Sequence, residues 1–450
     1  MSNSWYNRRQ AGSRGLKTLL EAHARLGPII RLGPQEVSVV SEEGLRKIYA
    51  AGLDKSSWYQ KTFFLYGVQN LVSTLDHSTH AKNRRIVAGL YNKSYLQRCK
   101  NLASLSDHIV CSRLLPRLDF YSLNANTVNV MRLFACIGVD MITGHIFGAA
   151  YSTDLLADEA KGGEYIETCA SGTEFKENYF EHIYRELLST RGTQEELRVS
   201  PSAAETMYNG LASQRSAGYV ADREIFAESA SEMLDHIIAT QETNTIIWTY
   251  ICYRLSLHPQ LQDRLRLELR TLEPRITNEI TNLPSPASLE KLPLLDAIVQ
   301  ETLRLHAANP ARMPRVAPTG GMTLHGYDIP AGTIVSTNAY CLHRNPDVFP
   351  EPLEWRPERW MPHRPEEKLD GPDLPRMKKW LWAFGSGARN CIGQHFAIQT
   401  IKLVVAAIYT THTTLIVNDE GIEQSDSYNS GPIGGKLILR FEHLKDTPEC

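Results

Sequence analysis

Residues 384–393 read Phe-Gly-Ser-Gly-Ala-Arg-Asn-Cys-Ile-Gly, and this stretch places one cysteine, Cys391, in a setting suited to a metal. Its glycines allow the backbone to turn tightly and to lie close against a flat ligand without side-chain clash. Beyond the cysteine, apolar residues recur at near-helical spacing, which predicts a buried helix that starts directly after Gly393. We therefore expect Cys391 at a helix N-terminus.

The expected position of Cys391 favours its thiolate form. Free backbone N–H groups and the positive end of a helix dipole stabilise a thiolate and lower its proton affinity. A stable thiolate is a good axial ligand for iron, and electron donation from it to haem iron favours O–O cleavage. Taken alone, a cysteine in a glycine-rich turn is more often a small buried hydrophobe. The order Phe-x-x-Gly-x-Arg-x-Cys-x-Gly fixes several residue types at once, however, so chance is a poor explanation.

This stretch resembles the haem-binding loop of the cytochrome P-450 family, in which the cysteine is the proximal iron ligand. The resemblance implies haem b (iron protoporphyrin IX) as the cofactor and Cys391 as the metal ligand. It assigns Phe384 and Gly387 to the cofactor-binding loop, and Arg389 to a haem propionate. We then ask whether the rest of the chain agrees.

Composition sets the outer bounds. The chain has 450 residues but no Ser/Gly/Pro tract or charge block that divides it, so one large domain is favoured. A formal net charge of -2 gives no basic surface for nucleic acid. The eight cysteines show no Cys-x-x-Cys spacing, which argues against zinc sites and a disulfide scaffold.

The first residues carry no apolar run, so the sequence predicts neither a signal peptide nor a transmembrane segment there. Eukaryotic members of the P-450 family usually open with a membrane anchor and lie on the cytosolic face of the endoplasmic reticulum. Either the protein is soluble or the anchor is missing from this version of the chain. We expect residues 1–26 to form an N-terminal segment without an anchor and residues 27–450 to form the P-450 domain.

Two short strands are predicted between residues 27 and 40, separated by Gly-Pro turns. A helix is expected over residues 80–96, where His80 and Arg84 are four apart and share one face. In isolation such a pair is most often a solvated charged face. In the family a Trp and an Arg from this helix reach a haem propionate. The resemblance therefore assigns Arg84 to the cofactor, with His80 at the position of the usual Trp.

A long helix is predicted from about residue 222 to residue 257, a range without Gly or Pro. Its middle, Ala239-Thr240-Gln241-Glu242-Thr243, puts polar groups inside an apolar span, where they are costly unless paired or used. A polar edge facing solvent is the simpler interpretation. The segment is also similar to the family's oxygen-binding motif. That similarity implies two catalytic residues: Thr243 hydrogen-bonds dioxygen and Glu242 helps to deliver protons. Thr240 replaces the usual Gly.

A second helix is predicted to start at Pro293, with Glu301 on its apolar stripe. A buried Glu needs a cation, and Arg304 is in reach. Most pairs with this spacing are weak surface contacts. The family has a Glu-x-x-Arg pair here, joined by an Arg from a Pro-Glu-Arg-Phe-like segment, which residues 357–360 supply with Arg359. We predict that the three residues form a structural triad that fixes the cysteine loop.

Residues 326–335 alternate like a hairpin around a Pro-Ala-Gly turn. By resemblance, Arg315 binds a propionate, although a surface arginine before a strand is the alternative. Residues 306–313 would border the substrate, and a turn-rich stretch at 428–435 would enter the substrate cavity. The elements that enclose the substrate would lie between residues 121 and 219.

Four motifs occur in the family order, and the resemblance implies a mainly α fold with a small β region. It implies a haem-thiolate monooxygenase that inserts one oxygen atom of O2 into a small apolar organic substrate. Electrons would come from NADPH through a separate NADPH-cytochrome reductase. Two stretches, 382–393 and 326–334, look most like fungal members, which often act in secondary metabolism. A haem-thiolate dehydratase or isomerase acting without NADPH, and a non-catalytic haem-binding protein, are the alternatives.

Overall fold

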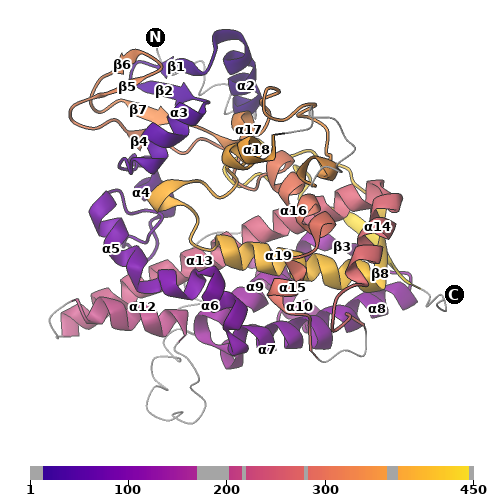
Figure 1. Cartoon of the computed structure of the whole chain (residues 1–450). Coiled ribbons are helices and arrows are strands. Elements are labelled where there is room, and N and C mark those ends of the chain that lie inside the picture. Colours follow the sequence, from indigo (N-terminus) through magenta and orange to yellow (C-terminus); the bar gives the residue numbers. More distant parts are fainter. Residues whose placement is uncertain (1–13, 170–201, 215–218, 278–281, 362–372, 445–450) are drawn as a thin grey trace.

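The computed structural model describes residues 14–169, 202–214, 219–277, 282–361 and 373–444 (Figure 1). The fold is mainly α with a small β region, as predicted. The helices of the described part are α2 (Gly15–Leu26), α3 (Glu42–Gly44), α4 (Trp58–Phe63), α5 (His77–Val87), α6 (Lys93–Arg98), α7 (Lys100–Ile109), α8 (Leu115–Leu123), α9 (Val130–Phe147), α10 (Glu159–Cys169), α12 (Ala203–Ala212), α13 (Tyr219–Leu257), α14 (Pro259–Leu269), α15 (Pro286–Leu289), α16 (Pro293–Leu305), α17 (Ala339–Leu342), α18 (Leu374–Trp380) and α19 (Gln394–Thr411).

The strands of the described part form three small sheets. They are β1 (Ile29–Gly33), β2 (Glu36–Val39), β3 (Thr127–Asn129), β4 (Arg315–Val316), β5 (Met322–Leu324), β6 (Tyr327–Ile329), β7 (Ile334–Ser336), β8 (His412–Asn418) and β9 (Ile438–His443). The largest sheet has the order β1-β2-β7-β4, with β2 and β7 parallel and the other two pairs antiparallel. In Figure 1 its strands gather with α2 at one end of the molecule, while most helices lie in the other part, together with the sheet of β3, β9 and β8.

The hairpin near residue 326 differs from the prediction. Its turn lies at His325 and Gly326, between β5 and β6, and the Pro-Ala-Gly segment instead connects β6 to β7. His325 and Gly326 both have positive φ angles, of 51° and 78°, which a tight hairpin turn requires. Strand β7 pairs with β2 and β4, which lie far from it in sequence, so the local alternation misidentified its partner.

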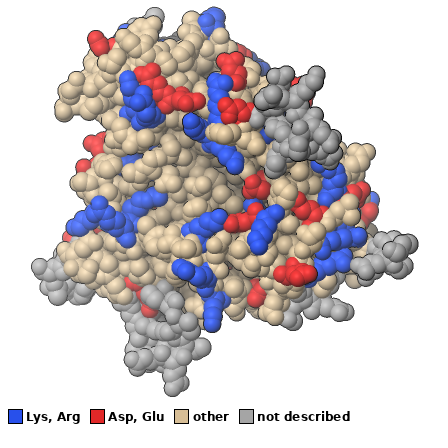
Figure 2. All heavy atoms as spheres, in the orientation of Figure 1, with Lys and Arg blue, Asp and Glu red and all other residues tan. Residues whose placement is uncertain are grey.

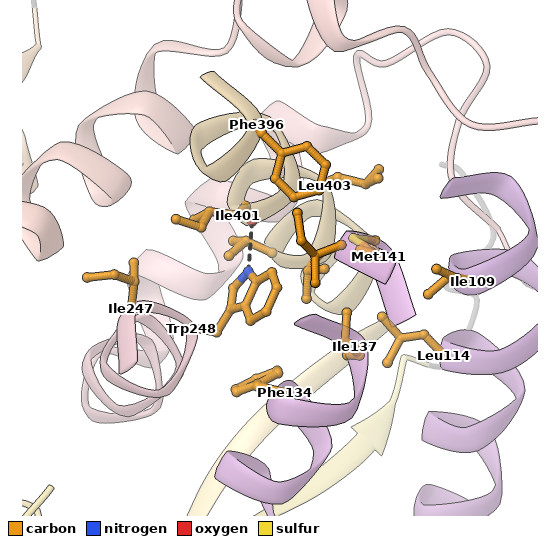
Figure 3. Close-up of a cluster of buried hydrophobic side chains, with 14 of the residues drawn as sticks. Ile109, Leu114, Phe134, Ile137, Met141, Ile247, Trp248, Phe396, Ile401 and Leu403 are labelled. Carbon is orange, nitrogen blue, oxygen red and sulfur yellow. Dashed lines mark hydrogen bonds between the residues drawn. The ribbon is translucent and has the colours of Figure 1, made fainter. Parts of the chain in front are cut away.

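Helix α13 runs through the helical part of the molecule and was predicted within three residues of its observed start (Figure 1). It packs against α9, α12, α16 and α19. Figure 3 shows the centre of this packing, where Trp248 of α13 meets Phe134 of α9 and Ile401 of α19. Trp248 is fully buried, and its indole N–H donates to the Ile401 carbonyl oxygen at 3.4 Å. A buried indole thus satisfies its polar atom while it holds α13 beside α19.

Helices α9 and α13 approach closely at Gly138. A Cβ atom at this position would lie 3.4 Å from the Cα of Gln241, which is an ordinary van der Waals contact, so the two backbones leave room for little more than a methyl group. In the described part of the chain α9 is also the one helix that is long and apolar enough to cross a membrane. Because 83% of it is buried inside the protein, a core helix explains the same composition.

The N-terminal end of the described chain is packed onto the domain. Helix α2 lies against β1 and α17, and its His23 ring contacts the Ser38 hydroxyl at 2.9 Å. The backbone N–H of Leu16 donates to the Asp426 carboxylate at 2.8 Å. Residues 15–26 are therefore bound to the same body as the strands that follow.

The surface carries both signs of charge. On the face drawn in Figure 2, separate Lys and Arg side chains and separate Asp and Glu side chains are scattered over a mostly uncharged surface. This mixture agrees with the formal net charge of -2. It gives that face no extended basic patch of the kind that binds nucleic acid.

Candidate functional site

A single deep cavity brings together most of the residues that the sequence analysis selected. Its volume is about 260 Å³. The predicted site residues that line it are Phe384, Arg389, Cys391, Arg84, His80, Arg315 and Thr243. Gly387 and Glu242, which were also predicted, are not among the lining residues.

The cysteine loop closes one wall of this cavity. The backbone N–H of Cys391 donates to the Phe384 carbonyl oxygen at 2.9 Å, which closes the loop into a turn. Gly385 and Gly387 have φ angles of 68° and 72°, values that L side chains rarely adopt. A Cβ on Gly387 would also collide with the backbone carbonyl of Tyr49. This glycine therefore allows the loop to pack against the segment around Tyr49 of the same chain, and it does not contact the ligand site.

Cys391 lies two residues before Gly393, the N-cap of α19, close to the predicted helix terminus. Its side chain is open to the cavity, deep inside the protein. Burial raises the pKa of the thiol, while the backbone N–H of Gly393 and the Arg84 guanidinium act in the opposite direction. The expectation of a lowered proton affinity is therefore wrong for the thiol by itself, because desolvation outweighs the helix terminus.

The three predicted arginines reach the cavity from different elements. Arg389 donates to the backbone oxygens of residues 74 and 75 at 2.7 and 2.5 Å. Arg315 is buried and donates to the Tyr59 hydroxyl at 2.9 Å. Arg84 of α5 grips the cysteine loop, since it donates to the Asn390 carbonyl and side-chain oxygens at 2.7 and 2.8 Å.

Lys55 is a further cation of this cavity that the sequence analysis missed. It is 7% exposed, and its ammonium donates to the Val72 carbonyl oxygen at 2.6 Å. Burial, together with the nearby Arg315 and Arg389, moves its pKa well below the ordinary value. The sequence around Lys55 does not predict this role. Lys55 is placed at the cavity by an isolated antiparallel β-bridge between its backbone and that of Arg315, which is far away in the sequence.

These cations have no anionic partner of their own. Within the described ranges, Lys55, Arg84, Arg315 and Arg389 form no ion pair with a carboxylate. Two buried nitrogens facing the same region, Nε of Arg389 and Nδ1 of His80, also lack a hydrogen-bond partner. Burial and the neighbouring cations lower the pKa of His80 to about 3, so its ring is neutral. The wall is therefore suited to a ligand that carries negative charge.

Another part of the cavity lining comes from the middle of α13. Ala239, Thr240, Thr243 and Asn244 line the cavity, so the Thr that replaces the usual Gly adds bulk there. The Thr243 hydroxyl donates to the Ala239 carbonyl oxygen at 2.8 Å. The carboxylate of Glu242 instead accepts a hydrogen bond from the side chain of Asn429.

The predicted triad is present and buried. Arg304 donates to both carboxylate oxygens of Glu301, at 2.7 and 2.9 Å, and Arg359 donates to one of them at 3.0 Å. Trp360 adds an indole donor at 2.8 Å. Glu301 and Arg304 are fully buried, so the prediction of a structural cluster is confirmed and the surface alternative is wrong.

His343 connects this triad to the cysteine loop. Its Nε2 accepts the backbone N–H of Trp382 at 2.7 Å, so its Nδ1 carries the proton and donates to the Arg304 carbonyl oxygen at 2.8 Å. Burial lowers the pKa of the ring to about 3, which keeps it in this neutral form. The Trp382 indole then donates to the Ser386 hydroxyl at 2.9 Å, inside the loop.

We predict that His343→Phe destabilises the protein by about 1–3 kcal/mol for each backbone group left without a partner. The reason is that both the Trp382 N–H and the Arg304 carbonyl are buried. Urea unfolding followed by circular dichroism measures the change. His258→Phe is the matched control, because the His258 ring also contacts a backbone carbonyl, at 2.7 Å, but is exposed. Equal losses in the two variants would contradict this role.

The rest of the cavity agrees with the predicted substrate side. Asn309 and Met313, from the stretch expected to border the substrate, line it, and so does Tyr428 from the turn-rich stretch. Tyr428 packs against Trp58 and Phe63, with ring centroids 5.4 and 5.2 Å apart. The substrate-enclosing elements expected between residues 121 and 219 lie partly at 170–201 and 215–218, outside the described residues.

Comparison with known proteins identifies the family. The family model described as cytochrome P450 matches residues 207–432, which is half of the chain and includes α13, the triad and the cysteine loop. The chain belongs to the cytochrome P450 family. The P450 family implies a haem cofactor, and the predicted fold class and family are confirmed.

Three fungal relatives extend the similarity over most of this P450. Cytochrome P450 monooxygenase avaI of Aspergillus versicolor is 29% identical over 84% of this chain and 94% of its own length. Monooxygenase FGM1 of Gibberella zeae is 25% identical over 95% of this chain and 88% of its own. Monooxygenase TRI4 of Trichoderma arundinaceum is 26% identical over 85% and 78%. This P450 is accordingly an oxidoreductase of the monooxygenase type.

Proposed function

We propose that this P450 is a haem-thiolate monooxygenase that inserts one oxygen atom of O2 into a small organic substrate of fungal secondary metabolism. Cys391 would be the metal ligand, and electrons would come from NADPH through a reductase. The observation that carries the proposal is one cavity whose lining includes both Cys391 and the Thr243 face of α13. The fungal origin of the relatives supports the metabolic role.

The residues of the cavity fit haem. A flat ring needs a loop without side chains in its way, and Gly385, which lines the cavity before Cys391, provides such a position. Two propionates need cations, and Arg315, Arg389 and Lys55 have no ion pair in the described part of the chain. Arg84 holds the loop through Asn390 and would place its positive charge near both the ring and the sulfur. His80 would offer its unpartnered Nδ1 to the same acidic groups.

Cys391 would hold the haem, which when bound would supply the iron at which dioxygen is reduced, and electron donation from its thiolate would favour O–O cleavage. The residues of α13 would handle protons. The Thr243 hydroxyl donates its hydrogen to the Ala239 carbonyl oxygen. The lone pairs of the Thr243 oxygen can therefore accept a hydrogen bond from a group in the cavity. Glu242 is held by Asn429 beside this segment, so it would act on protons through solvent rather than from the cavity wall.

Thr243→Ala tests the proton-handling role. We expect the CO difference spectrum to be retained, while product formed per NADPH falls roughly tenfold or more, because positioned proton transfer contributes about 10²–10⁴-fold in rate. The missing electrons appear as hydrogen peroxide, which a coupled peroxidase assay measures. Thr249→Ala is the control, since its hydroxyl makes the same bond to a carbonyl four residues earlier but does not line the cavity. Unchanged coupling in Thr243→Ala would contradict the role.

Product formation with and without reductase and NADPH separates the alternatives. A monooxygenase forms product only when reductase, NADPH and O2 are all present. A dehydratase or isomerase acts on an oxidised substrate without NADPH, and a sensor or carrier forms no product. The Thr243 face of α13 favours the monooxygenase. A substrate-induced shift of the haem absorbance, screened over candidate metabolites, gives the substrate needed for the assay.

Two further assignments remain proposals. We propose that residues 27–450 form the catalytic domain, with helix α2 packed on its first sheet. We also propose that this P450 meets its reductase at the cytosolic face of the endoplasmic reticulum, as family members usually do. Fractionation of cells that express the tagged full-length protein tests the second assignment.

A further inference from the structure

Asp235 places a carboxylate on the cavity wall one helical turn before the oxygen motif. Asp235, Ala239 and Thr243 follow one another at four-residue intervals on α13, so they share one helix face. All three line the cavity that holds Cys391. The carboxylate therefore belongs to the chamber in which the reaction takes place.

This carboxylate is buried but has no partner. Asp235 is 9% exposed, and the described residues provide it with neither a hydrogen bond nor an ion pair. Burying a carboxylate in this way is expensive unless a donor or a cation reaches it. Burial and the nearby charge of Glu232 raise the pKa of Asp235 to about 7. Asp235 thus lacks the group that would stabilise its charged form.

The polar neighbours of Asp235 are engaged elsewhere. Glu232 accepts the backbone N–H of Leu71 at 2.7 Å and pairs with His236 at 2.9 Å. The other ring nitrogen of His236 contacts the Tyr91 hydroxyl at 2.8 Å.

Lys55, whose positive charge also acts on Asp235, donates to the Val72 and Leu71 carbonyl oxygens at 2.6 and 3.4 Å. Glu242, whose charge also reaches Asp235, is bound by Asn429. Lys55 and Glu242 therefore have other hydrogen-bond partners, and Asp235 remains part of the cavity lining.

We propose that Asp235 is a specificity-determining residue that receives a protonated nitrogen of the substrate. A cation fits better than a neutral donor, because hydrogen bonds to a carboxylate from a charged donor are the stronger ones. Glu232 and Glu242 add negative potential at Asp235, and His236 and Lys55, which act in the opposite direction, make no hydrogen bond to it in the described part of the chain. The proposal rests on the proposed function and sharpens it. The substrate would be an organic molecule with an apolar body and a basic group, held so that a carbon near that group faces the iron. A wholly apolar substrate would leave the carboxylate buried without a partner.

Binding of matched probes to the haem-loaded enzyme tests this inference. The probes are n-octylguanidine, which is positively charged at neutral pH, 1-octanol and octanoate, and the readout is the absorbance shift of the haem together with calorimetry. We expect the wild type to bind the guanidinium at least about tenfold more tightly than octanoate, since hydrogen bonds to charged groups contribute about 1.5–3 kcal/mol. In Asp235→Asn the guanidinium affinity falls about tenfold, and the affinity for 1-octanol stays within about twofold.

Asp328→Asn is the control, since it removes the same charge from an exposed residue of β6, and it leaves all three affinities unchanged. The proposal is wrong if the wild type binds the guanidinium no more tightly than octanoate. The proposal is also wrong if Asp235→Asn still prefers the guanidinium to octanoate and only lowers the stability of the protein. That result would mean that Asp235 serves as a counter-charge for Lys55. A missing thiolate-type CO difference spectrum in the wild type would instead overturn the proposed function, so the two failures are distinguishable.

Discussion

Replacing Cys391 with alanine abolishes the thiolate-type CO difference spectrum and reduces NADPH-dependent product formation to background. We expect this result because Cys391 is the one cysteine, among the described residues, that lines the cavity. Without its sulfur the cavity would offer iron no thiolate ligand, and the electron donation that favours O–O cleavage would be lost. The measurement is the CO difference spectrum of the reduced, purified variant, followed by product analysis with reductase and NADPH.

A second cysteine supplies the control for that experiment. Cys111 is half-buried, and it lies outside the cavity. Cys111→Ala therefore keeps the wild-type spectrum and the wild-type rate of product formation. A thiolate-type spectrum in Cys391→Ala would mean that another group ligates the iron and that the site is misassigned.

The second large effect is expected at Glu301. Glu301→Gln keeps the size of the side chain but removes the charge that balances two buried arginines, Arg304 and Arg359. Breaking a buried ion pair from one side costs about 3–5 kcal/mol, because an uncompensated charge stays buried. We expect a loss of this size in urea unfolding, together with a lower haem content, since Arg304 connects through His343 to the segment before Cys391.

Glu290→Gln is the matched control for Glu301→Gln. Glu290 pairs with Lys93 at 2.7 Å on the surface, where both side chains are partly exposed. Surface pairs of this kind contribute about 0–1 kcal/mol. Similar losses in the two variants would show that the buried triad does not hold the fold, and a normal haem content in Glu301→Gln would separate the triad from the cysteine loop.

The features that the sequence predicted correctly depend on local patterns. Helices α13 and α16 follow from apolar periodicity and from Pro293 at a helix start, which act within one element. The Glu301 triad could be predicted because a carboxylate on an apolar stripe requires cations. The short hairpin was misplaced, since strand β7 pairs with β2 across nearly 300 residues, and local alternation contains no information on that pairing.

The features that the sequence did not reveal depend on contacts between distant segments. From the sequence alone, Lys55 is an ordinary lysine, and its burial follows from the pairing of its backbone with Arg315. Asp235 is likewise an ordinary acidic residue of a helix, and only the fold places it in the cavity lining. The pKa of Cys391 is a third case. Helix position alone predicts a more acidic thiol, but burial depends on the whole fold and reverses the direction.

The most direct test of the haem-thiolate assignment is the CO difference spectrum of the reduced wild-type protein. We predict the band of thiolate-ligated haem, with one haem per chain, because the cavity joins a single cysteine to a set of unpaired cations in the described part of the chain. A spectrum typical of histidine-ligated haem, or no haem binding at all, would contradict the assignment of Cys391.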